Sequence, residues 1–507
     1  MPDDFHHFNT SKYPISEAIS TINLLFDIHS IIYICIHINI CVYIYNSNIL
    51  VDYYMEDILI LGIGVSLKKN DGVLRFEKYC QIFDLPYIIV GDGKIWKGGD
   101  MSVGAGGGQK INELLIALET ITDNKLIIVC DTFDLFPVAN KQEILNKYHQ
   151  ICGEKERVVF SSEVYCWPEK NLANIYTQIY PKIISKYRYL NSGSFMGRRN
   201  DICALLNNIL DTDDDQLFFT KKYLQSSNII LDTECQLFQA INGSTDDIGI
   251  HDNRIYNKYT KTFPIFIHGN GPAKTFLNYL ENNLHPKSLV NIVNTKLVSD
   301  QYKVFIALYI DSNSINELKI FLDSVTKINC TNKIIYVYDK SHSDYFKQLL
   351  EMLGFIYSSN VSNYVFVDFI KSDCDYYFLL EQNCILTNSM TLEILIHLCQ
   401  NNNRIVSPLL IGKENTNFAN FWGALDKNGY YKRSDDYLNI IRQEKIGLWN
   451  VPYIYGVILF NKSIINDWNL SQYEKHKDDR DMNLCFNLRK HTLFMYTCNL
   501  DCYGYII

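Results

Sequence analysis

The sequence is short of several features that mark common classes of protein. Lysine and arginine number 47 against 56 aspartates and glutamates, which gives a net charge of −9. Clustered basic residues are what neutralise nucleic-acid phosphates, so we expect no nucleic-acid partner. No two of the 15 cysteines are separated by two residues, so a zinc knuckle is not expected. The odd number forbids complete internal pairing, and we expect most cysteines to be reduced and buried.

The chain also lacks an apolar run as long as a bilayer requires. The stretch IIYICIHINICVYIY at 31–45 is shorter than the ~20 residues that a spanning helix needs. Three interpretations of residues 1–54 stay open: a membrane anchor, a hydrophobic segment packed on the body, or non-native leader sequence translated from AT-rich DNA upstream of a start at Met55. We expect the residues before about Asp52 to be poorly ordered.

From Met55 onward, strand-like and helix-like segments alternate. The apolar, β-branched runs are 58–65, 86–91, 126–131 and 157–163, and helical spacing is found at 75–85 and 111–121. This alternation predicts a mostly parallel sheet covered by helices on both faces. Ligands of such folds bind beyond the carboxyl ends of the strands.

A second alternation of the same kind begins at Lys303, after the polar stretch 282–302. The predicted fold class is therefore α/β, with two tandem Rossmann-like domains over 55–285 and 286–507. Each would contain a mixed, mostly parallel sheet flanked by helices.

Two carboxylates follow the predicted strand LIIVCD. Asp131 ends this strand and Asp134 comes three residues later, which suits a hard divalent cation, although a helix N-cap is the ordinary alternative. His268 ends another apolar run and precedes the loop GNGPAK, so it could be a structural histidine, a metal ligand or a phosphate contact. The corresponding position of the second alternation reads Glu381-Gln382-Asn383, so we expect no second metal site.

Three further stretches add chemistry. GAGGGQK at 104–110 looks like a phosphate cradle, but Ile111 follows Lys110 where a Walker motif has Ser or Thr, so a P-loop nucleotidase is not expected. DTDDDQLFF at 211–219 is either a solvated helix N-terminus or a row of carboxylates facing sugar hydroxyls. Trp96 is a candidate to stack on a nucleotide base. Together these features favour a nucleotide-sugar transferase whose metal neutralises the diphosphate leaving group.

With these motifs in view, the sequence resembles the multifunctional procollagen lysyl hydroxylase/glycosyltransferase family. The motifs that follow the glycosyltransferase domain in order are IWKGGD (95–100), VGAGGGQK (103–110), CDTFD (130–134), FSSEVYCWPE (160–169), YLNSGSFMG (189–197), DDDQLFFT (213–220) and IHGNGPAK (267–274). Those that follow the accessory domain are FWGAL (421–425), YYKRSDDY (430–437) and GLWNVPYI (447–454). The resemblance implies two GT-A-like domains, the second without an intact metal motif. The hydroxylase domain of the family has no counterpart here, and we do not expect that activity.

The resemblance implies transfer of a hexose from a UDP-sugar onto galactosylhydroxylysine or hydroxylysine of a collagen-like polypeptide, with retention and with Mn²⁺. UDP-glucose is the favoured donor and UDP-galactose the alternative. Sugar-nucleotide hydrolysis would need the same residues. A non-catalytic module that binds collagen or a nucleotide sugar is the alternative of a different class, and a homodimer is a further expectation.

The resemblance also assigns roles to residues. Asp131, Asp134 and His268 would hold the metal. Trp96 would stack on uracil, and Lys110, Gly271 and Lys274 would contact the nucleotide or its diphosphate. The residues around the donor sugar or the reacting centre would be Asp214, Asp215, Asn270, Asn191 and Gln216. Glu163, Cys166 and Trp167 would line the acceptor side.

Overall fold

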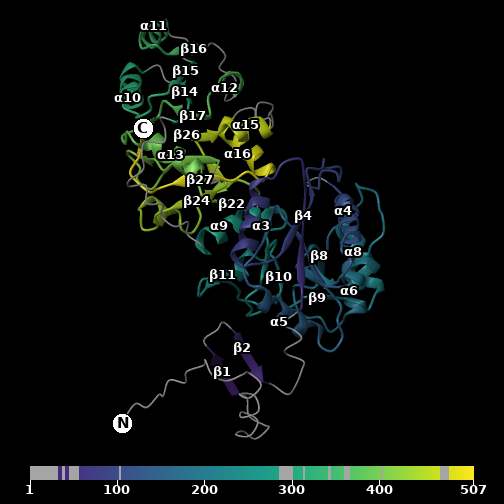
Figure 1. The fold of residues 1–507 in the computed structure, drawn as a ribbon. Helices are drawn as coiled ribbons and strands as arrows, with labels where there is room; N and C mark the ends of the chain where they lie inside the picture. The colour runs from purple at the N-terminus through teal and green to yellow at the C-terminus, as the bar shows by residue number, and fades with distance from the viewer. Residues whose placement is uncertain are drawn as a thin grey trace, which may run out of the picture. The chain divides into compact units, whose positions relative to one another are not determined.

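The computed structural model describes residues 32–36, 40–44, 56–101, 104–284, 301–311, 314–340, 344–358, 366–400, 404–426, 428–468 and 479–507. The chain divides into two compact units, Met1–Asp57 and Ile58–Ile507. In the first unit, β1 (Ile32–Ile36) and β2 (Ile40–Ile44) pair in antiparallel fashion (Figure 1). The expectation about order before Asp52 otherwise falls outside the described residues. None of the described helices has the length and apolar character needed to cross a bilayer.

A six-stranded sheet forms the centre of the first half of the second unit. Its order is β4 (Tyr87–Asp92), β3 (Ile58–Ser66), β5 (Leu126–Asp131), β8 (Tyr189–Arg198), β7 (Val158–Glu163) and β9 (Ile229–Leu231). β3 is parallel to β4 and β5, and β7 is parallel to β9, whereas β8 runs antiparallel between β5 and β7. The central strands β3 and β5 are apolar on both faces because helices cover both faces.

Helices cover this sheet on both sides. They are α3 (Asp71–Ile82), α4 (Gly108–Glu119), α5 (Lys141–Cys152), α6 (Leu172–Ile179), α7 (Arg199–Leu205) and α8 (Asp215–Gln225). A further helix, α9 (Lys274–Leu284), packs instead with Phe136 and Ile267. Leu61 and Ile127 pack with α4, α6, α7 and α8, whereas the alternate residues Ile60 and Ile128 pack with α3 and α5. Polar side chains start three of these helices: Asn70, Asn140 and Asp214 each accept a backbone N–H of the first turn.

A small three-stranded sheet lies beside the large one. β13 (Phe266–His268) is parallel to β10 (Phe238–Ala240) and antiparallel to β6 (Leu135–Pro137). In this register His268 lies opposite Leu135, the residue after Asp134. Two 3₁₀ turns, η1 (Thr245–Asp247) and η2 (Gly271–Ala273), and the hairpin of β11 (Ile248–His251) and β12 (Arg254–Asn257) complete this half.

The second half is built around an eight-stranded sheet. Its order is β16 (Ile356–Ser358), β15 (Lys333–Asp339), β14 (Val304–Ile310), β17 (Tyr376–Glu381), β26 (Val457–Asn461), β19 (Ile405–Pro408), β27 (Met495–Cys498) and β24 (Leu448–Val451). Its helices are α10 (Ile315–Thr326), α11 (Asp344–Met352), α12 (Phe366–Lys371), α13 (Thr391–Gln400), α14 (Tyr437–Ile441), α15 (Lys462–Trp468) and α16 (Arg480–Lys490). Short strands form small sheets at its margin: β18 (Cys384–Leu386), β28 (Gly504–Ile506) and β20 (Ile411–Gly412); β21 (Phe421–Trp422) and β25 (Tyr453–Ile454); β22 (Ala424–Leu425) and β23 (Tyr431–Lys432).

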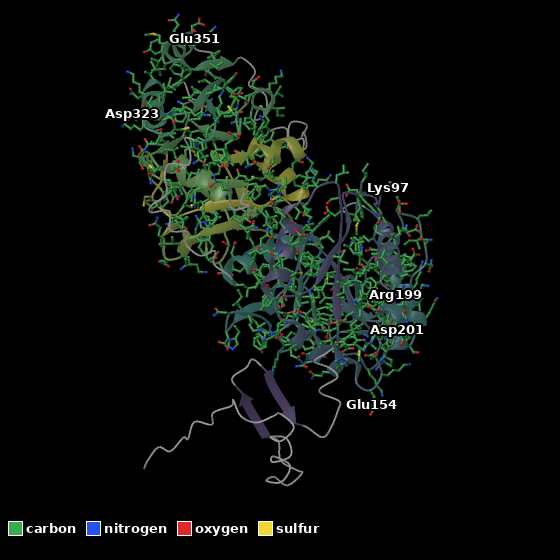
Figure 2. The ribbon with its side chains drawn as sticks, viewed as in Figure 1. Lys97, Glu154, Arg199, Asp201, Asp323 and Glu351 are labelled. Atoms are coloured by element: carbon green, nitrogen blue, oxygen red, sulfur yellow. The ribbon has the colours of Figure 1, made fainter. Side chains whose placement is uncertain are left out.

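The predicted fold class is confirmed. Three of the five strand pairings in the first sheet and four of the seven in the second are parallel. Charged side chains such as Lys97, Asp323 and Glu351 project outward (Figure 2). Among the described residues every cysteine is free and most are buried, as expected.

A cluster of three phenylalanines gives a direct test of this core. The Phe160 ring stacks on Phe195 at 4.4 Å between centroids and lies 5.1 Å from Phe219 of α8. Phe160→Ala should cost about 3–5 kcal/mol, because the cavity cannot close between a sheet and a packed helix. The measurement is the urea midpoint of the intact chain. Ile116→Ala, at a position 53% exposed, is the control and should change stability by less than about 0.5 kcal/mol. Equal midpoints for the two variants would contradict this packing.

Candidate active site

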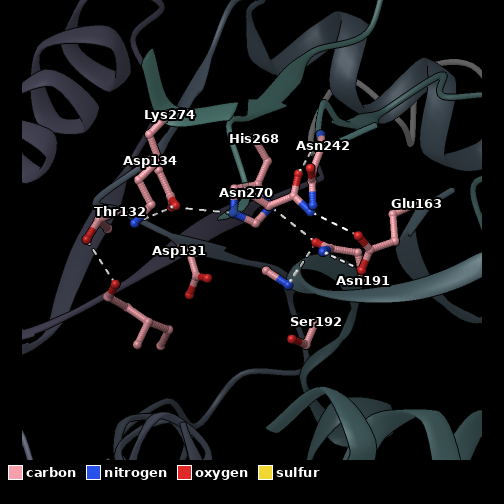
Figure 3. Close-up of polar contacts among 12 residues, drawn as sticks. Asp131, Thr132, Asp134, Glu163, Asn191, Ser192, Asn242, His268, Asn270 and Lys274 are labelled. Carbon is pink, nitrogen blue, oxygen red and sulfur yellow. Dashed lines mark hydrogen bonds and ion pairs between the residues drawn. The ribbon is translucent and has the colours of Figure 1, made fainter. Parts of the chain in front are cut away.

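Three potential metal ligands converge because two sheets meet at this point. Asp131 is the last residue of β5, Asp134 lies in the loop to β6, and His268 ends β13, which β6 holds in register (Figure 3). One ligand atom from each residue lies within 4.8 Å of the other two. His268 Nε2 lies 3.4 Å from Asp134 Oδ1.

These residues fit a single divalent cation. Ligand atoms bound at about 2.0–2.2 Å lie at most about 4.4 Å apart across the ion, so a small closure of the side chains would suffice. Two carboxylates and one imidazole form a donor set of hard oxygens with one nitrogen. Asp131 and Asp134 are not the caps of any described helix, which was the ordinary alternative.

Asn191 orients the His268 ring. The Asn191 amide nitrogen donates to Glu163 Oε1 at 3.2 Å, so its oxygen is an acceptor, and the backbone N–H of Gly193 also donates to that oxygen. His268 Nδ1, 3.1 Å from the same oxygen, is therefore the protonated ring nitrogen. The lone pair of Nε2 is left for a cation on the side of Asp134.

Two lysines compensate the clustered negative charge. Lys110 Nζ lies 2.9 and 3.0 Å from the two Asp131 oxygens and 3.5 Å from Asp215, and Lys274 Nζ lies 3.1 Å from Asp134. Burial raises the pKa of Asp131 despite the opposing Lys110 charge. Burial acts the same way on Asp134, but Lys274 and His268 more than offset it and hold the pKa of Asp134 far below its usual value.

The same charges act on the cationic groups. Burial lowers the pKa of His268, but the carboxylates of Asp134 and Asp131 outweigh burial and raise it overall. Likewise Asp131 and Asp215 raise the pKa of Lys110 against the effect of burial, so Lys110 stays charged. A cation that binds His268 must displace a proton from its ring, which couples metal affinity to pH.

A buried carboxylate organises the amides next to the candidate metal ligands. Glu163 accepts from Gln216 at 2.7 Å and Asn191 at 3.2 Å on one oxygen, and from Asn270 at 3.0 Å on the other. Asn270 in turn accepts the backbone N–H of Asn242 at 3.0 Å. Burial raises the pKa of Glu163, and the amide hydrogen bonds of Gln216 and Asn191 oppose that rise.

Ser192 and Gly193 also belong to the candidate site, although no sequence pattern indicated a role for them. Ser192 Oγ lies 3.4 Å from Asp215 and its backbone N–H donates to Gln216 at 3.3 Å. Together with Lys110 and Asp131, Ser192 and Asp215 line one hollow. Gly193 lies against the His268 ring, where any side chain would collide. The sequence feature that could have pointed to them is the NSG segment at 191–193, in which only Asn191 carries an expected role.

The remaining predicted residues have different local settings. Trp96 is part-buried, and its indole N–H donates to the Gly99 carbonyl at 2.6 Å. Gly271 has φ +57° and is the first residue of η2, the turn that directly precedes Lys274. Cys166 is part-buried and its thiol donates to the Glu169 carbonyl, whereas the Trp167 side chain is 52% exposed.

Asp214 differs from the others because it caps α8. Its Oδ1 accepts the Leu217 N–H at 2.7 Å, so one carboxylate oxygen is already engaged by the helix. Of the two interpretations of the acidic run 211–219, Asp214 therefore fits the helix N-terminus. Asp215 faces Lys110 and Ser192 instead.

Comparison with known proteins adds the class. A family model described as "PLOD GT domain" matches residues 56–291, and one described as "Glycosyltransferase family 25, N-terminal domain" matches 367–507. Among solved structures, GalNAc-T7 with UDP, GalNAc and Mn²⁺ is similar at a TM-score of 0.30 and 11% identity, over 41% of this chain and 44% of that one. The protein is a glycosyltransferase.

Its curated relatives identify the family. Uncharacterized protein R699 of Acanthamoeba polyphaga mimivirus is 50% identical over 456 residues, which cover 89% of this chain and 98% of that protein. The multifunctional procollagen lysine hydroxylase and glycosyltransferase LH3 of Homo sapiens is 30% identical over 493 residues, or 88% of this chain. The present chain spans 65% of the length of that human relative. The chain belongs to the procollagen lysyl hydroxylase/glycosyltransferase family.

Gly193 provides a steric test of the candidate metal site. A Cβ at Gly193 would lie 2.2 Å from His268 Cε1 and 2.7 Å from Nδ1, so Gly193→Ala must displace the ring. We expect Mn²⁺ affinity to fall by roughly 10- to 100-fold, as for loss of an outer-shell partner. Electron paramagnetic resonance of free Mn²⁺ measures it. Gly249→Ala is the matched control, since its Cβ would meet only the flexible Lys258 side chain at 3.3 Å. Wild-type affinity in Gly193→Ala would exclude His268 as a ligand.

Proposed function

We propose that this protein transfers a hexose from a UDP-sugar, with UDP-glucose as the favoured donor, onto galactosylhydroxylysine or hydroxylysine of a collagen-like polypeptide. Catalysis would reside in residues 55–285, with Asp131, Asp134 and His268 holding Mn²⁺, and residues 286–507 would form an accessory domain. The observation that carries the proposal is the convergence of this triad with two lysines and the Glu163 amide network. The name of the LH3 relative, a procollagen lysine hydroxylase and glycosyltransferase, supports the choice of acceptor.

The charges around the triad suit a diphosphate leaving group. Lys274 follows directly on the η2 turn, and Lys110 lies at the start of α4. Both ammonium groups face the triad carboxylates, so they would add positive charge where phosphate oxygens approach. The bound cation would supply further neutralisation as the bond to the sugar breaks. Trp96 would stack on the uracil, and Gly271 would let its backbone come close to the nucleotide.

The network beyond the triad suits a sugar. Asn191, Gln216 and Asn270 are held in fixed orientations by one carboxylate, and Asp215 offers acceptor oxygens beside Ser192. Groups that are already oriented bind hydroxyls without an ordering cost at the moment of reaction. Asp214 would contribute its second oxygen near this centre. Cys166 and Trp167, next to Glu163 in sequence, would meet the acceptor.

In the proposed reaction the acceptor hydroxyl oxygen bonds to the anomeric carbon as the bond to the diphosphate breaks. The hydroxyl proton leaves with the diphosphate oxygens, which balances the charge. The chain's own part is to bind, orient and exclude water. Where water replaces the acceptor, the same residues would hydrolyse the donor, so the acceptor dependence of turnover is the distinguishing measurement.

The deciding assay is UDP release with Mn²⁺ from UDP-glucose and from UDP-galactose. Each donor is tested alone, with a hydroxylysine peptide and with a galactosylhydroxylysine peptide. We expect release from UDP-glucose to depend on the galactosylhydroxylysine peptide. Release with UDP-galactose and hydroxylysine would move the proposal to the other donor, and acceptor-independent release would indicate hydrolysis. Absence of release in every combination would overturn the proposed function.

Asp131→Asn tests the metal ligand with little change of shape. Turnover should fall by more than the roughly 10- to 100-fold that loss of an outer-shell partner costs. Circular dichroism and the urea midpoint report whether the fold is intact. Asp323→Asn, which removes an exposed carboxylate of α10, is the control and should leave turnover unchanged. An unfolded Asp131→Asn chain would show that the carboxylate is structural instead.

The pH dependence should report Glu163. Burial raises its pKa above that of an ordinary glutamate, and its amide partners need an acceptor, so turnover should fall as the pH drops through that raised pKa. Glu163→Gln replaces the carboxylate with an amide that accepts hydrogen bonds at one atom only, so turnover should fall at every pH. The loss of turnover at acidic pH should then disappear, because no carboxylate is left to titrate. Glu154→Gln, at an exposed position, should keep the wild-type profile. An acidic limb unchanged in Glu163→Gln would assign it to another group.

A further inference from the structure

Helix α9 connects the candidate active site to the second half of the unit. Its first residue, Lys274, pairs with Asp134 at 3.1 Å, and Asn282 lies eight residues later, about 12 Å along the helix. Leu277 and Leu280 pack with Phe136 of β6 and Ile267 of β13, the strands next to the metal ligands. Any shift of α9 would therefore move Lys274 relative to the triad.

The second half holds the far end of α9, chiefly through hydrogen bonds between the Asn282 side chain and the main chain of Asn450. The Asn282 side chain donates to the Asn450 carbonyl at 2.9 Å and accepts the Asn450 N–H at 2.9 Å. Asn450 is in β24, the edge strand of the large sheet, so the Asn282 amide takes the place of a neighbouring strand. One residue further, Asn283 accepts from Lys445 at 2.7 Å.

Arg75 ties α9, β6 and the second half together. Its side chain is only 3% exposed and donates to Asn278 of α9 at 2.7 Å. Its guanidinium carbon lies 5.3 Å from the ring centroid of Phe136 and 4.8 Å from that of Phe494. Such contacts between a desolvated guanidinium and aromatic rings are among the stronger cation–π interactions.

Asp71, one helical turn before Arg75, makes its contacts with the second half. It accepts from Arg404 at 2.6 Å and from the Phe494 N–H at 2.6 Å, and its own N–H donates to the Thr492 carbonyl at 3.1 Å. Thr492 has φ +54°, a conformation that a β-branched residue rarely adopts. The turn is therefore held by its contacts rather than by its own preference.

We propose that the second half is a brace for the active site, and that Asn282, Arg75 and Asp71 are positioning residues that hold Lys274 at the metal and diphosphate position through α9. This inference rests on the proposed function for the identity of the ligand. A second half that was merely attached to the first would need contacts only between the outer surfaces of the two halves. Here the contacts converge on α9, which begins at the candidate metal site, and on the strand that follows Asp134.

The test uses the intact chain and measures UDP affinity in the presence of Mn²⁺ by calorimetry, beside kcat and KM for the UDP-sugar. Asn282→Ala should weaken UDP affinity and raise KM by about 3- to 10-fold while kcat stays within about twofold. Asn146→Ala removes an amide that accepts from Gln142 within α5 and is the matched control. Asp71→Asn acts on the brace from α3 and should give the same pattern, so the test does not depend on one variant folding well.

A double-variant cycle shows whether the effect passes through Lys274. In a Lys274→Met background, Asn282→Ala should cause no further loss of UDP affinity. Additive losses, or an Asn282→Ala affinity within twofold of wild type, overturn the brace. A wild-type chain that binds UDP and Mn²⁺ but shows no transfer overturns the proposed function alone, and one that binds neither overturns both.

Discussion

The structure around the candidate site depends on one constraint, which is the gathering of four acidic side chains in a small and largely buried volume. Asp131, Asp134, Asp215 and Glu163 lie within one connected network. Buried carboxylates are costly unless they are paired or hydrogen-bonded. The chain meets this requirement with Lys110, Lys274, His268 and three amides, and it leaves the triad with room for a further cation. The pairing of β6 with β13 and the starts of α4 and α9 are what bring these partners in.

The glycine-rich segment serves the same constraint. A Cβ on Gly108 would lie 2.0 Å from the Leu210 carbonyl oxygen, and one on Gly107, at φ +99°, would lie 2.8 Å from the Asp215 carboxyl. These glycines let the start of α4 approach the start of α8, so that Lys110 reaches Asp131 and Asp215 together. Their direct effect is close backbone packing, which explains why the segment looks like a phosphate cradle without the Ser or Thr of a Walker motif.

Local sequence predicted much of this arrangement, and the rest depends on long-range pairing. The strand 126–131 occurs with the predicted bounds, because an unbroken apolar run ending in a carboxylate has a strong local signal. The hydrogen bond between Asn191 and His268 spans 77 residues and follows from the register of β6 and β13, which no local pattern records. Asp214 shows the opposite limit: a helix cap and a sugar contact share one sequence signature, and only the structure shows that one oxygen of Asp214 accepts the Leu217 N–H at 2.7 Å.

The second half carries the same strand plan with a different solution to the charge problem. β17 lies between parallel β14 and antiparallel β26, as β5 lies between β3 and β8, and Glu381 ends β17 as Asp131 ends β5. Arg480 lies 3.1 Å from Glu381 and 3.6 Å from Asp311, with its guanidinium over Tyr309. A covalently attached cation here neutralises the strand-end carboxylate, whereas in the first half an exchangeable ion would complete the compensation. Because Arg480 already balances these carboxylates, this part of the second half needs no bound ion to keep its structure. A region that supports a neighbouring site needs this property.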